Sequence, residues 1–357
     1  MERVARVSAV DPAFWAGRRV LVTGHTGFKG AWLSLWLRHL GADVHGFALP
    51  PATNPSLFEL ADVGRGMTSI LGDLRDPAQV NDAVHRAAPE IVFHLAAQAL
   101  VVESLADPVG TMATNVMGTV HLLEALRGQA DVRVVLTVTS DKVYANDESG
   151  AAFAEDFPLG GKDPYSASKA AAELVVRAWR ESFLAKAGVR LATARGGNVI
   201  GGGDYAADRI VPDVVRAAAA DRPVVLRMPG ATRPWQHVLD CLAGYILYAQ
   251  ALGQGRAVPP SLNFGPWAGD PISVGELARI VAEALGGRGF EHRPVAGSVE
   301  MKTLAVDAAL ARETLGWTDR LPGRRAIDWT AHWYQRVGSG AAPLATTLEQ
   351  IEAYARG

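Results

Sequence analysis

The sequence predicts an α/β fold with a doubly wound parallel sheet and a smaller C-terminal substructure. Three observations support this prediction: strand-like and helix-like runs alternate from residue 18 to residue 200, most strand-like runs contain consecutive apolar residues that would face both sides of a sheet, and a glycine-rich turn follows the first strand. Strands without a polar face are typical of a parallel sheet that helices cover on both sides. The connections between such strands are right-handed crossovers.

The elements follow in order along the chain. The expected strands are rich in β-branched residues and cover residues 18–24, 43–49, 68–74, 90–96, 134–140 and 190–200. The expected helices lie between them at residues 30–42, 76–88, 108–128 and 166–188. From about Ile200 the elements become shorter and richer in proline. We therefore expect a main domain over residues 14–200 and a smaller one over 201–340, with a strand near 261–266 that could return to the main sheet.

The composition excludes several classes of protein. The 357 residues carry a formal charge of −2 and one cysteine, Cys241. A near-neutral charge does not suggest a nucleic acid or an anionic membrane as partner, and one cysteine excludes an intramolecular disulfide and a cysteine-rich metal site. No apolar run reaches the roughly 18 residues that span a bilayer, and no signal peptide is evident. We expect a cytoplasmic protein without a metal site.

Three glycines, Gly24, Gly27 and Gly30, lie between the first strand and the first helix. In this order they allow a tight turn, a close approach of the backbone to a pyrophosphate, and packing of the helix on the sheet. The start of the helix attracts the phosphates. The pattern predicts a Rossmann-like dinucleotide site, although glycines of an ordinary turn would look the same.

Other cofactor contacts are expected at the ends of neighbouring strands. Asp73 follows the third strand and is a candidate partner for the adenine amino group, with a simple turn aspartate as the alternative. Neither an acidic residue for a ribose 2′-OH nor an arginine cluster for a 2′-phosphate follows the second strand, so we predict NAD without excluding NADP. The expected cofactor-binding residues are Gly24, Gly27, Phe28, Lys29, Gly30, Asp73, Leu74, Leu95, Ala96, Ala97, Tyr165 and Lys169.

Tyr165 and Lys169 are four residues apart in a predicted helix, and therefore lie on one face of it. An ammonium near a phenol favours the phenolate and lowers the pKa of the tyrosine. Tyr165 would then be a general base for an alcohol proton, and Lys169 could also hold the nicotinamide ribose. The alternative is an idle pair on an amphipathic surface helix.

The fifth strand ends in Ser140, Asp141 and Lys142. Taken alone, an acid next to a base at a strand end indicates a turn with a solvated ion pair.

The segments "TGHTGFKG", "YSASK" and "TSDK" resemble the extended short-chain dehydrogenase/reductase family. "GGKDPYSASKAAAEL", "GGNVIGGGDYAADRIVPD" and "RPWQHVLDCLAGY" resemble the CDP-glucose 4,6-dehydratases within it. The likeness runs from about Phe14 to about Tyr334. It implies a nucleotide-sugar substrate, bound in part by the smaller domain. It also implies a homodimer, because this family pairs the helices at 108–126 and 166–184 of two subunits.

The resemblance assigns a role to each catalytic candidate. Tyr165 and Lys169 serve oxidation at C4 of the sugar, and Ser140 binds O4. A dehydratase must also remove the C5 proton and protonate the departing C6 hydroxyl, which implies Lys142 as the base and Asp141 as the acid. The residues implied to bind the substrate are Gln98, Asn198, Arg209 and Arg233.

This chain departs from the family pattern after the fourth strand, in the segment "AAQALVVESL". Val102 or Glu103, depending on the alignment, stands where the family usually has an arginine, and Leu105 stands where it has a tyrosine. The nucleotide base and the sugar therefore stay open. The alternative functions are an epimerase or a 5,6-dehydratase acting on another nucleotide sugar, or a catalytically idle nucleotide-binding regulator.

Overall fold

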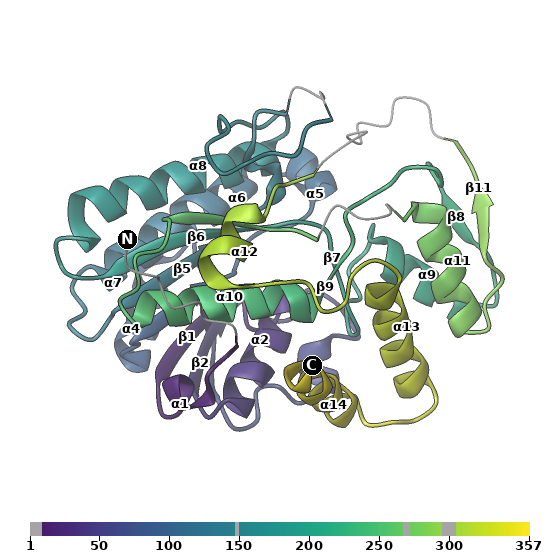
Figure 1. The fold of residues 1–357 in the computed structure, drawn as a ribbon, viewed down its shortest axis with the longest axis horizontal. Coiled ribbons are helices and arrows are strands. Elements are labelled where there is room, and N and C mark those ends of the chain that lie inside the picture. Colours follow the sequence, from purple (N-terminus) through teal and green to yellow (C-terminus); the bar gives the residue numbers. More distant parts are fainter. Residues whose placement is uncertain (1–8, 147–149, 267–271, 295–304) are drawn as a thin grey trace.

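The computed structural model describes residues 9–146, 150–266, 272–294 and 305–357. Its centre is a seven-stranded sheet in the order β10-β6-β5-β4-β1-β2-β3, and every neighbouring pair is parallel (Figure 1). The strands are β1 (Arg19–Thr23), β2 (Asp43–Ala48), β3 (Thr68–Leu71), β4 (Ile91–His94), β5 (Val134–Val138), β6 (Arg190–Gly196) and β10 (Ser261–Phe264). The strand order runs outward in both directions from β1 and β4, so the predicted doubly wound sheet is confirmed.

Helices cover both faces of this sheet. One layer contains α2 (Phe28–His39) and α10 (Val238–Gly253), and the other contains α4 (Pro77–Ala87), α7 (Gly118–Leu126) and α8 (Pro164–Trp179). The shorter helices around the sheet are α1 (Pro12–Trp15), α3 (Leu57–Leu60), α5 (Val101–Ala106) and α6 (Pro108–Met112). They are accompanied by the π-helical segments η1 (Ala113–Met117) and η3 (Arg180–Leu184) and the 3-10 turn η2 (Asp141–Val143).

The core is split between these two faces. Val20 and Val22 of β1 are fully buried on the face that α2 and α10 cover, whereas Leu21 is fully buried among residues of α4, α7 and α8. Successive strand side chains point to opposite faces. An apolar residue at every position therefore buries both faces, as the sequence predicted.

The smaller substructure lies at the right of Figure 1. It contains β8 (Val224–Leu226), β11 (Phe290–His292), α9 (Ile210–Ala219), α11 (Val274–Ala284) and α13 (Arg324–Gly338). The short pair β7 (Val199–Ile200) and β9 (Gln236–His237) connects it to the sheet, and α12 (Ala309–Leu315) and α14 (Pro343–Arg356) complete the chain. The predicted domain boundaries at residues 200 and 340 stay a prediction.

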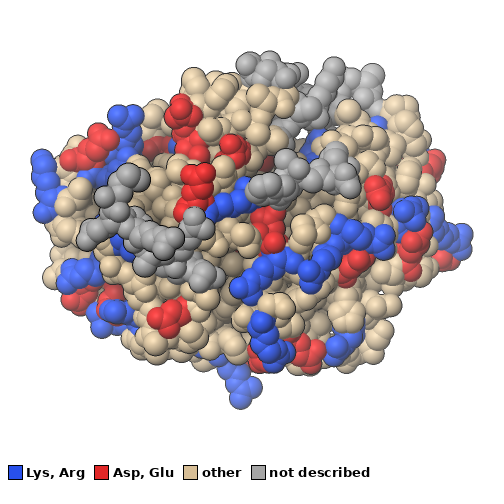
Figure 2. Space-filling model, in the orientation of Figure 1, with Lys and Arg blue, Asp and Glu red and all other residues tan. Residues whose placement is uncertain are grey.

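Figure 2 shows blue and red side chains interspersed among large tan areas on the face in view. No helix in the described part of the chain is both long and apolar enough to cross a membrane.

Candidate active site

The glycine-rich turn lies in close contact with both the end of β4 and the start of α2. Gly24 has a φ of +80°, and a Cβ on it would lie 2.7 Å from the backbone nitrogen of Ala96. A Cβ on Gly30 would lie 2.0 Å from the carbonyl oxygen of Gly24. Gly27 is the N-cap of α2, and no described side chain caps that helix. The turn therefore leaves the helix start with backbone N–H groups for an anion.

Two of the expected cofactor-binding residues, Asp73 and Leu74, are engaged within the protein. The guanidinium of Arg75 donates to both oxygens of Asp73, with distances of 3.0 and 2.8 Å from Nε. This hydrogen bond lowers the pKa of Asp73, which is therefore an anion at neutral pH. Leu74 is buried against Gly118, and its carbonyl accepts a hydrogen bond from His121. Their roles toward a cofactor stay predictions.

The segment after β5 is not a solvated turn. Asp141 is 3% exposed, and its Oδ1 accepts a hydrogen bond of 2.9 Å from the hydroxyl of Ser140. The same Ser140 oxygen accepts from the backbone N–H of Lys142 at 3.2 Å. Burial raises the pKa of Asp141 above its usual range, against the opposing charge of Lys142. A buried carboxyl held toward its protonated form is suited to donate a proton.

The tyrosine–lysine pair is buried beside this segment. Tyr165 and Lys169 lie in the first turns of α8 and are 8% and 7% exposed, so they are not an idle surface pair. Lys169 Nζ donates to the carbonyl of Val138, the last residue of β5, at 3.2 Å. Ser140 forms a hydrogen bond with the Tyr165 hydroxyl. Lys142 Nζ lies 5.8 Å from the centroid of the Tyr165 ring.

The pKa of Tyr165 differs from the sequence expectation. Burial raises it to about 12, and the hydrogen bond with Ser140 opposes this shift only in part. Burial, reinforced by the charge of Lys29, lowers the pKa of Lys169 to about 8. Each group is thus held toward its neutral form, because desolvation penalises the charged one. The prediction that Lys169 lowers the pKa of Tyr165 toward neutrality is therefore wrong for the protein alone.

The loop after β6 closes the opposite side of the site. A Cβ on Gly197 would lie 3.3 Å from Oδ2 of Asp141, which places the next residue, Asn198, beside the catalytic segment. The buried Nδ2 of Asn198 has no hydrogen-bond partner among the described residues. Arg209 pairs with Asp204 at 3.1 Å and lies close enough for its charge to act on Tyr165. Asn198 and Arg209 therefore border the candidate catalytic residues Asp141 and Tyr165, and their contact with a substrate stays a prediction.

Two other predicted substrate residues are not shown to join this group. The amide of Gln98 donates to Thr111 Oγ1 at 3.1 Å and to the carbonyl of Leu100 at 2.9 Å, and its Oε1 accepts from the Leu100 N–H at 2.6 Å. Arg233 donates to the neighbouring carbonyl of Thr232 at 2.9 Å. Their contact with a substrate stays a prediction.

A family model described as "NAD dependent epimerase/dehydratase family" matches residues 20–264. The chain belongs to this family. The predicted membership in the extended short-chain dehydrogenase/reductase group is thereby confirmed, and so is its enzymatic character.

Relatives within the family match nearly the whole chain. CDP-glucose 4,6-dehydratase of Salmonella typhimurium is 42% identical over 97% of this chain and 98% of the relative. dTDP-glucose 4,6-dehydratase of Mycolicibacterium smegmatis is 29% identical over 93% and 97%. The solved structure of Thermus thermophilus UDP-glucose 4-epimerase with NAD is 27% identical, covers 88% of this chain and 98% of that chain, and superposes with a TM-score of 0.75.

The family is NAD dependent, and the residues of this chain fit that cofactor. The cradle at Gly24 and Gly30 has no room for side chains, and the uncapped start of α2 faces it. Lys29 extends from the same turn to within electrostatic reach of Lys169 and Asp141. The prediction of NAD is confirmed by the family.

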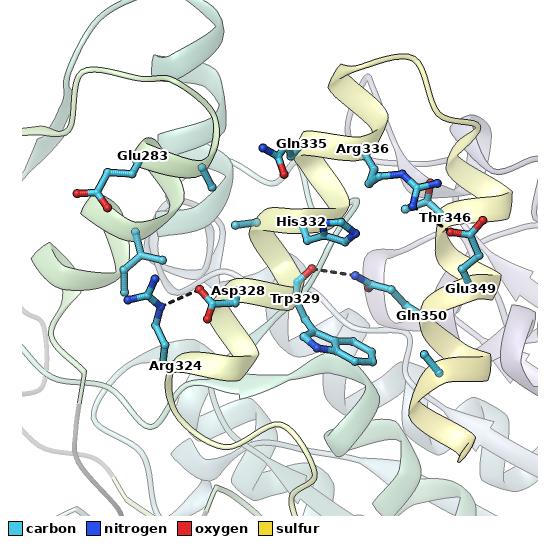
Figure 3. A pocket seen from close by; sticks show the side chains of 14 residues that line it. Glu283, Arg324, Asp328, Trp329, His332, Gln335, Arg336, Thr346, Glu349 and Gln350 are labelled. Atoms are coloured by element: carbon cyan, nitrogen blue, oxygen red, sulfur yellow. Dashed lines mark hydrogen bonds and ion pairs between the residues drawn. The ribbon is translucent and has the colours of Figure 1, made fainter. Parts of the chain in front are cut away.

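A separate cavity of about 750 Å³ lies among α11, α13 and α14 (Figure 3). Trp329 and His332 of α13 face Gln350 of α14, which donates to the carbonyl of Trp329 at 2.8 Å. None of the predicted site residues lines this cavity. The residues with the chemistry of this family therefore lie elsewhere, at the carboxyl ends of β1, β4, β5 and β6.

The sequence did not reveal the buried charges behind the catalytic residues. Glu173 and Arg195 form an ion pair of 2.9 Å with side chains only 3% and 5% exposed. Glu173 is four residues beyond Lys169 and eight beyond Tyr165, so the helical spacing already placed all three on one face. That spacing could have identified Glu173 from the sequence. Its partner Arg195 lies on β6, and identifying it required knowing which strands are neighbours in the sheet.

Proposed function

We propose that this chain is a nucleotide-sugar 4,6-dehydratase that converts CDP-glucose to CDP-4-keto-6-deoxyglucose. The observation that carries the proposal is the buried acid Asp141, with Lys142 next to it, adjoining the hydrogen-bonded pair of Ser140 and Tyr165. The 42% identity to a CDP-glucose 4,6-dehydratase over 97% of the chain supports the substrate.

The residues of the site divide into two groups by their part in the reaction. Tyr165 serves as the phenolate, which the Lys169 ammonium stabilises, and becomes the phenol as it accepts the proton of the 4-OH, while Ser140 hydrogen-bonds O4. NAD, when bound, supplies the acceptor for the C4 hydride and returns it to C6. The 4-keto group acidifies the C5 hydrogen, so that Lys142 can remove it as a proton. Asp141 protonates the departing C6 hydroxyl and water leaves; the proton taken up by Lys142 then returns to C5 when the hydride is added at C6.

A 4-epimerase needs only the first of these groups. Oxidation, rotation and reduction at C4 use one base, and a second acid–base pair has no task in them. If the segment were only a structural turn, its charged side chains would be expected in solvent, whereas Asp141 is 3% exposed. Burial of an ionisable acid is costly, so its place beside Ser140 supports the dehydratase over the epimerase and over an idle regulator.

The test is a panel of CDP-, UDP-, dTDP- and GDP-glucose incubated with the protein and NAD. CDP-glucose should give a product lighter by one water, with the highest kcat/KM of the four. A product of unchanged mass would indicate an epimerase. No turnover of any of the four, despite nucleotide-sugar binding, would indicate a regulator. Turnover with loss of water on another base would keep the reaction and change the substrate.

We further propose that the protein works as a homodimer formed through α6, η1 and α8, which contact one another along one side of the sheet. Several large apolar side chains on these elements are exposed. They are Val109 (78%), Met112 (37%), Met117 (47%) and Leu174 (57%). Self-complementary pairing about a two-fold axis would cover them. A cytoplasmic location remains the expectation from the sequence.

The dimer predicts a mass of two chains in light scattering at micromolar concentration. Val109→Glu combined with Leu174→Glu should shift the protein to a monomer, because four charges would lie in the interface of two subunits. The matched control is Val225→Glu on β8, an apolar residue 44% exposed on the other substructure, which should leave the mass unchanged. A monomeric wild-type protein would contradict the proposal.

A further inference from the structure

The two halves of the proposed chemistry are carried by different elements. Tyr165 and Lys169 lie on α8, whereas Asp141 and Lys142 lie on the short turn after β5. Both halves must act on neighbouring carbons of one sugar ring. A misplacement of about 1 Å can cost about 10²-fold in rate. The contacts that fix the turn against α8 therefore matter for the second half of the reaction.

One of these contacts is made by Glu173 on the N-terminal side of the turn. Glu173 lies on the same helix as Tyr165 and is 4% exposed. Its Oε1 accepts a hydrogen bond of 2.6 Å from the hydroxyl of Thr139, the residue before Ser140. The carboxylate therefore binds the turn directly to the helix of the redox pair.

The C-terminal side of the turn is held through Arg195. This guanidinium donates to both oxygens of Glu173, at 3.1 Å from Nε and 2.9 Å from Nη2. Its third nitrogen, Nη1, donates to the hydroxyl of Tyr144 at 2.8 Å. Tyr144 lies two residues after Lys142. The carboxylate of Glu173 is therefore linked to both ends of the turn, directly through Thr139 and indirectly through Arg195 and Tyr144.

The direction of each hydrogen bond in this chain is fixed. An arginine has only donors, so the Tyr144 oxygen accepts from it and the Tyr144 O–H is free to donate. It donates to Oδ1 of Asn263 on β10 at 2.6 Å. Asn263 is itself anchored, since its Nδ2 donates to the carbonyls of Phe153 and Asp307 at 2.9 Å each. The network has a single arrangement, which makes it suitable for holding a geometry.

These residues also act on the redox pair by charge. Burial lowers the pKa of Lys169, and the carboxylate of Glu173 opposes that shift. Burial likewise disfavours the charge on Arg195, but its hydrogen bond to Glu173 outweighs this and raises the pKa. Arg195 therefore keeps its charge beside Glu173.

We call the set Thr139, Tyr144, Glu173 and Arg195 the flanking clamp. We propose that the flanking clamp positions Asp141 and Lys142 for the elimination step, and that its members are positioning residues of the dehydratase. The inference rests on the proposed function. It adds that loss of a clamp contact slows elimination while C4 oxidation continues.

Thr139→Val is the first test, with Thr193→Val as its matched control. Both threonines donate a hydroxyl to the carboxylate of Glu173, Thr193 at 2.9 Å from β6, but only Thr139 adjoins the turn. Thr139→Val should slow elimination about 10- to 100-fold while oxidation proceeds, so reduced nicotinamide should accumulate after mixing with CDP-glucose. Thr193→Val should show no such accumulation.

Tyr144→Phe tests the other flank. The ring, which stacks on Phe153 at 5.2 Å between centroids, is kept, and only the hydroxyl between Arg195 and Asn263 is lost. This variant should also accumulate reduced nicotinamide and lose C5 hydrogen exchange with deuterated solvent. A thermal melt and NAD titration of each variant show that it is folded. If one variant fails to fold, the other decides.

The outcomes separate this inference from the proposed function. If wild-type protein does not release water from any nucleotide sugar, the proposed function fails. If wild-type protein is a dehydratase, but Thr139→Val and Tyr144→Phe slow oxidation and elimination equally, the residues are merely structural and the inference fails. Equal accumulation of reduced nicotinamide in Thr139→Val and Thr193→Val would also overturn the inference. The effect would then come from losing any hydrogen bond to Glu173, and not from losing the contact between Glu173 and the turn.

Discussion

The Tyr165→Phe variant should lose about 10²- to 10⁴-fold in the rate of C4 oxidation, the range typical of removing a positioned general base. The phenyl ring keeps the packing of a side chain that is 8% exposed, so the fold and nucleotide-sugar binding should change little. Ser140 loses its partner on the tyrosine, yet it retains Asp141 as an acceptor at 2.9 Å. Stopped-flow measurement of reduced nicotinamide after mixing with CDP-glucose, combined with calorimetric titration of the sugar, would check both expectations.

Tyr248→Phe is the control for this variant. Tyr248 is fully buried on α10, and its hydroxyl donates to the carbonyl of Pro259, away from the catalytic residues. The same chemical change there should leave oxidation within about two-fold of normal, as expected for a change that touches no reacting group. Turnover of Tyr165→Phe at a tenth of the normal rate or faster would refute Tyr165 as the base.

Local sequence patterns identified the features that depend on neighbouring residues. The glycines at 24, 27 and 30 and the pair Tyr165–Lys169 are set by turn geometry and helical spacing, and the structure brings them together as expected. The predicted helix at 30–42 corresponds to α2 at Phe28–His39, with a shift of two residues at the start. Such boundaries depend on the capping of the first turn, where Gly27 offers no side-chain signal.

Local sequence patterns do not predict properties that depend on burial in the tertiary structure. The sequence places Lys169 near Tyr165 and so predicts a lower pKa for the phenol, but it does not show that β5 and the loop after β6 exclude water from both. Burial raises the pKa of Tyr165 to about 12, and the hydrogen bond with Ser140 opposes this shift only in part. The helix α10 was missed for a related reason. It is buried almost throughout, so it lacks the polar face that marks a helix in a sequence.

The pH dependence of the elimination follows from the burial of Asp141. Burial raises the pKa of this carboxyl, which therefore stays protonated to a higher pH than an exposed aspartic acid. Because the protonated form is the acid that serves the departing hydroxyl, elimination should be fast below the raised pKa and should slow as the pH rises through it. Single-turnover rates of water loss across a pH series would show this alkaline limb. A limb at the pKa of an ordinary exposed aspartic acid would contradict it.

Asp141→Asn should block the reaction at a different step from Tyr165→Phe. The amide keeps the volume of the side chain and can still accept from the Ser140 hydroxyl, now 2.9 Å from Oδ1, but it cannot supply a proton to the C6 oxygen. Loss of the general acid should reduce elimination by about 10²- to 10⁴-fold. Oxidation at C4 uses Tyr165 and Lys169, which the substitution leaves in place.

The variant should therefore reduce NAD on mixing with CDP-glucose and then stall, because the hydride can return to C6 only after water has left. The observable is a near-stoichiometric rise of reduced nicotinamide that persists, with no product lighter by one water. Asp163→Asn is a matched control, since Asp163 is the N-cap of α8 and an asparagine caps a helix about as well. That control should form product at a normal rate without accumulation. If Asp141→Asn also gave normal product at a normal rate, Asp141 would have no part in elimination. The turn after β5 would then be equally compatible with an epimerase and with a dehydratase. The proposed function would have to be abandoned.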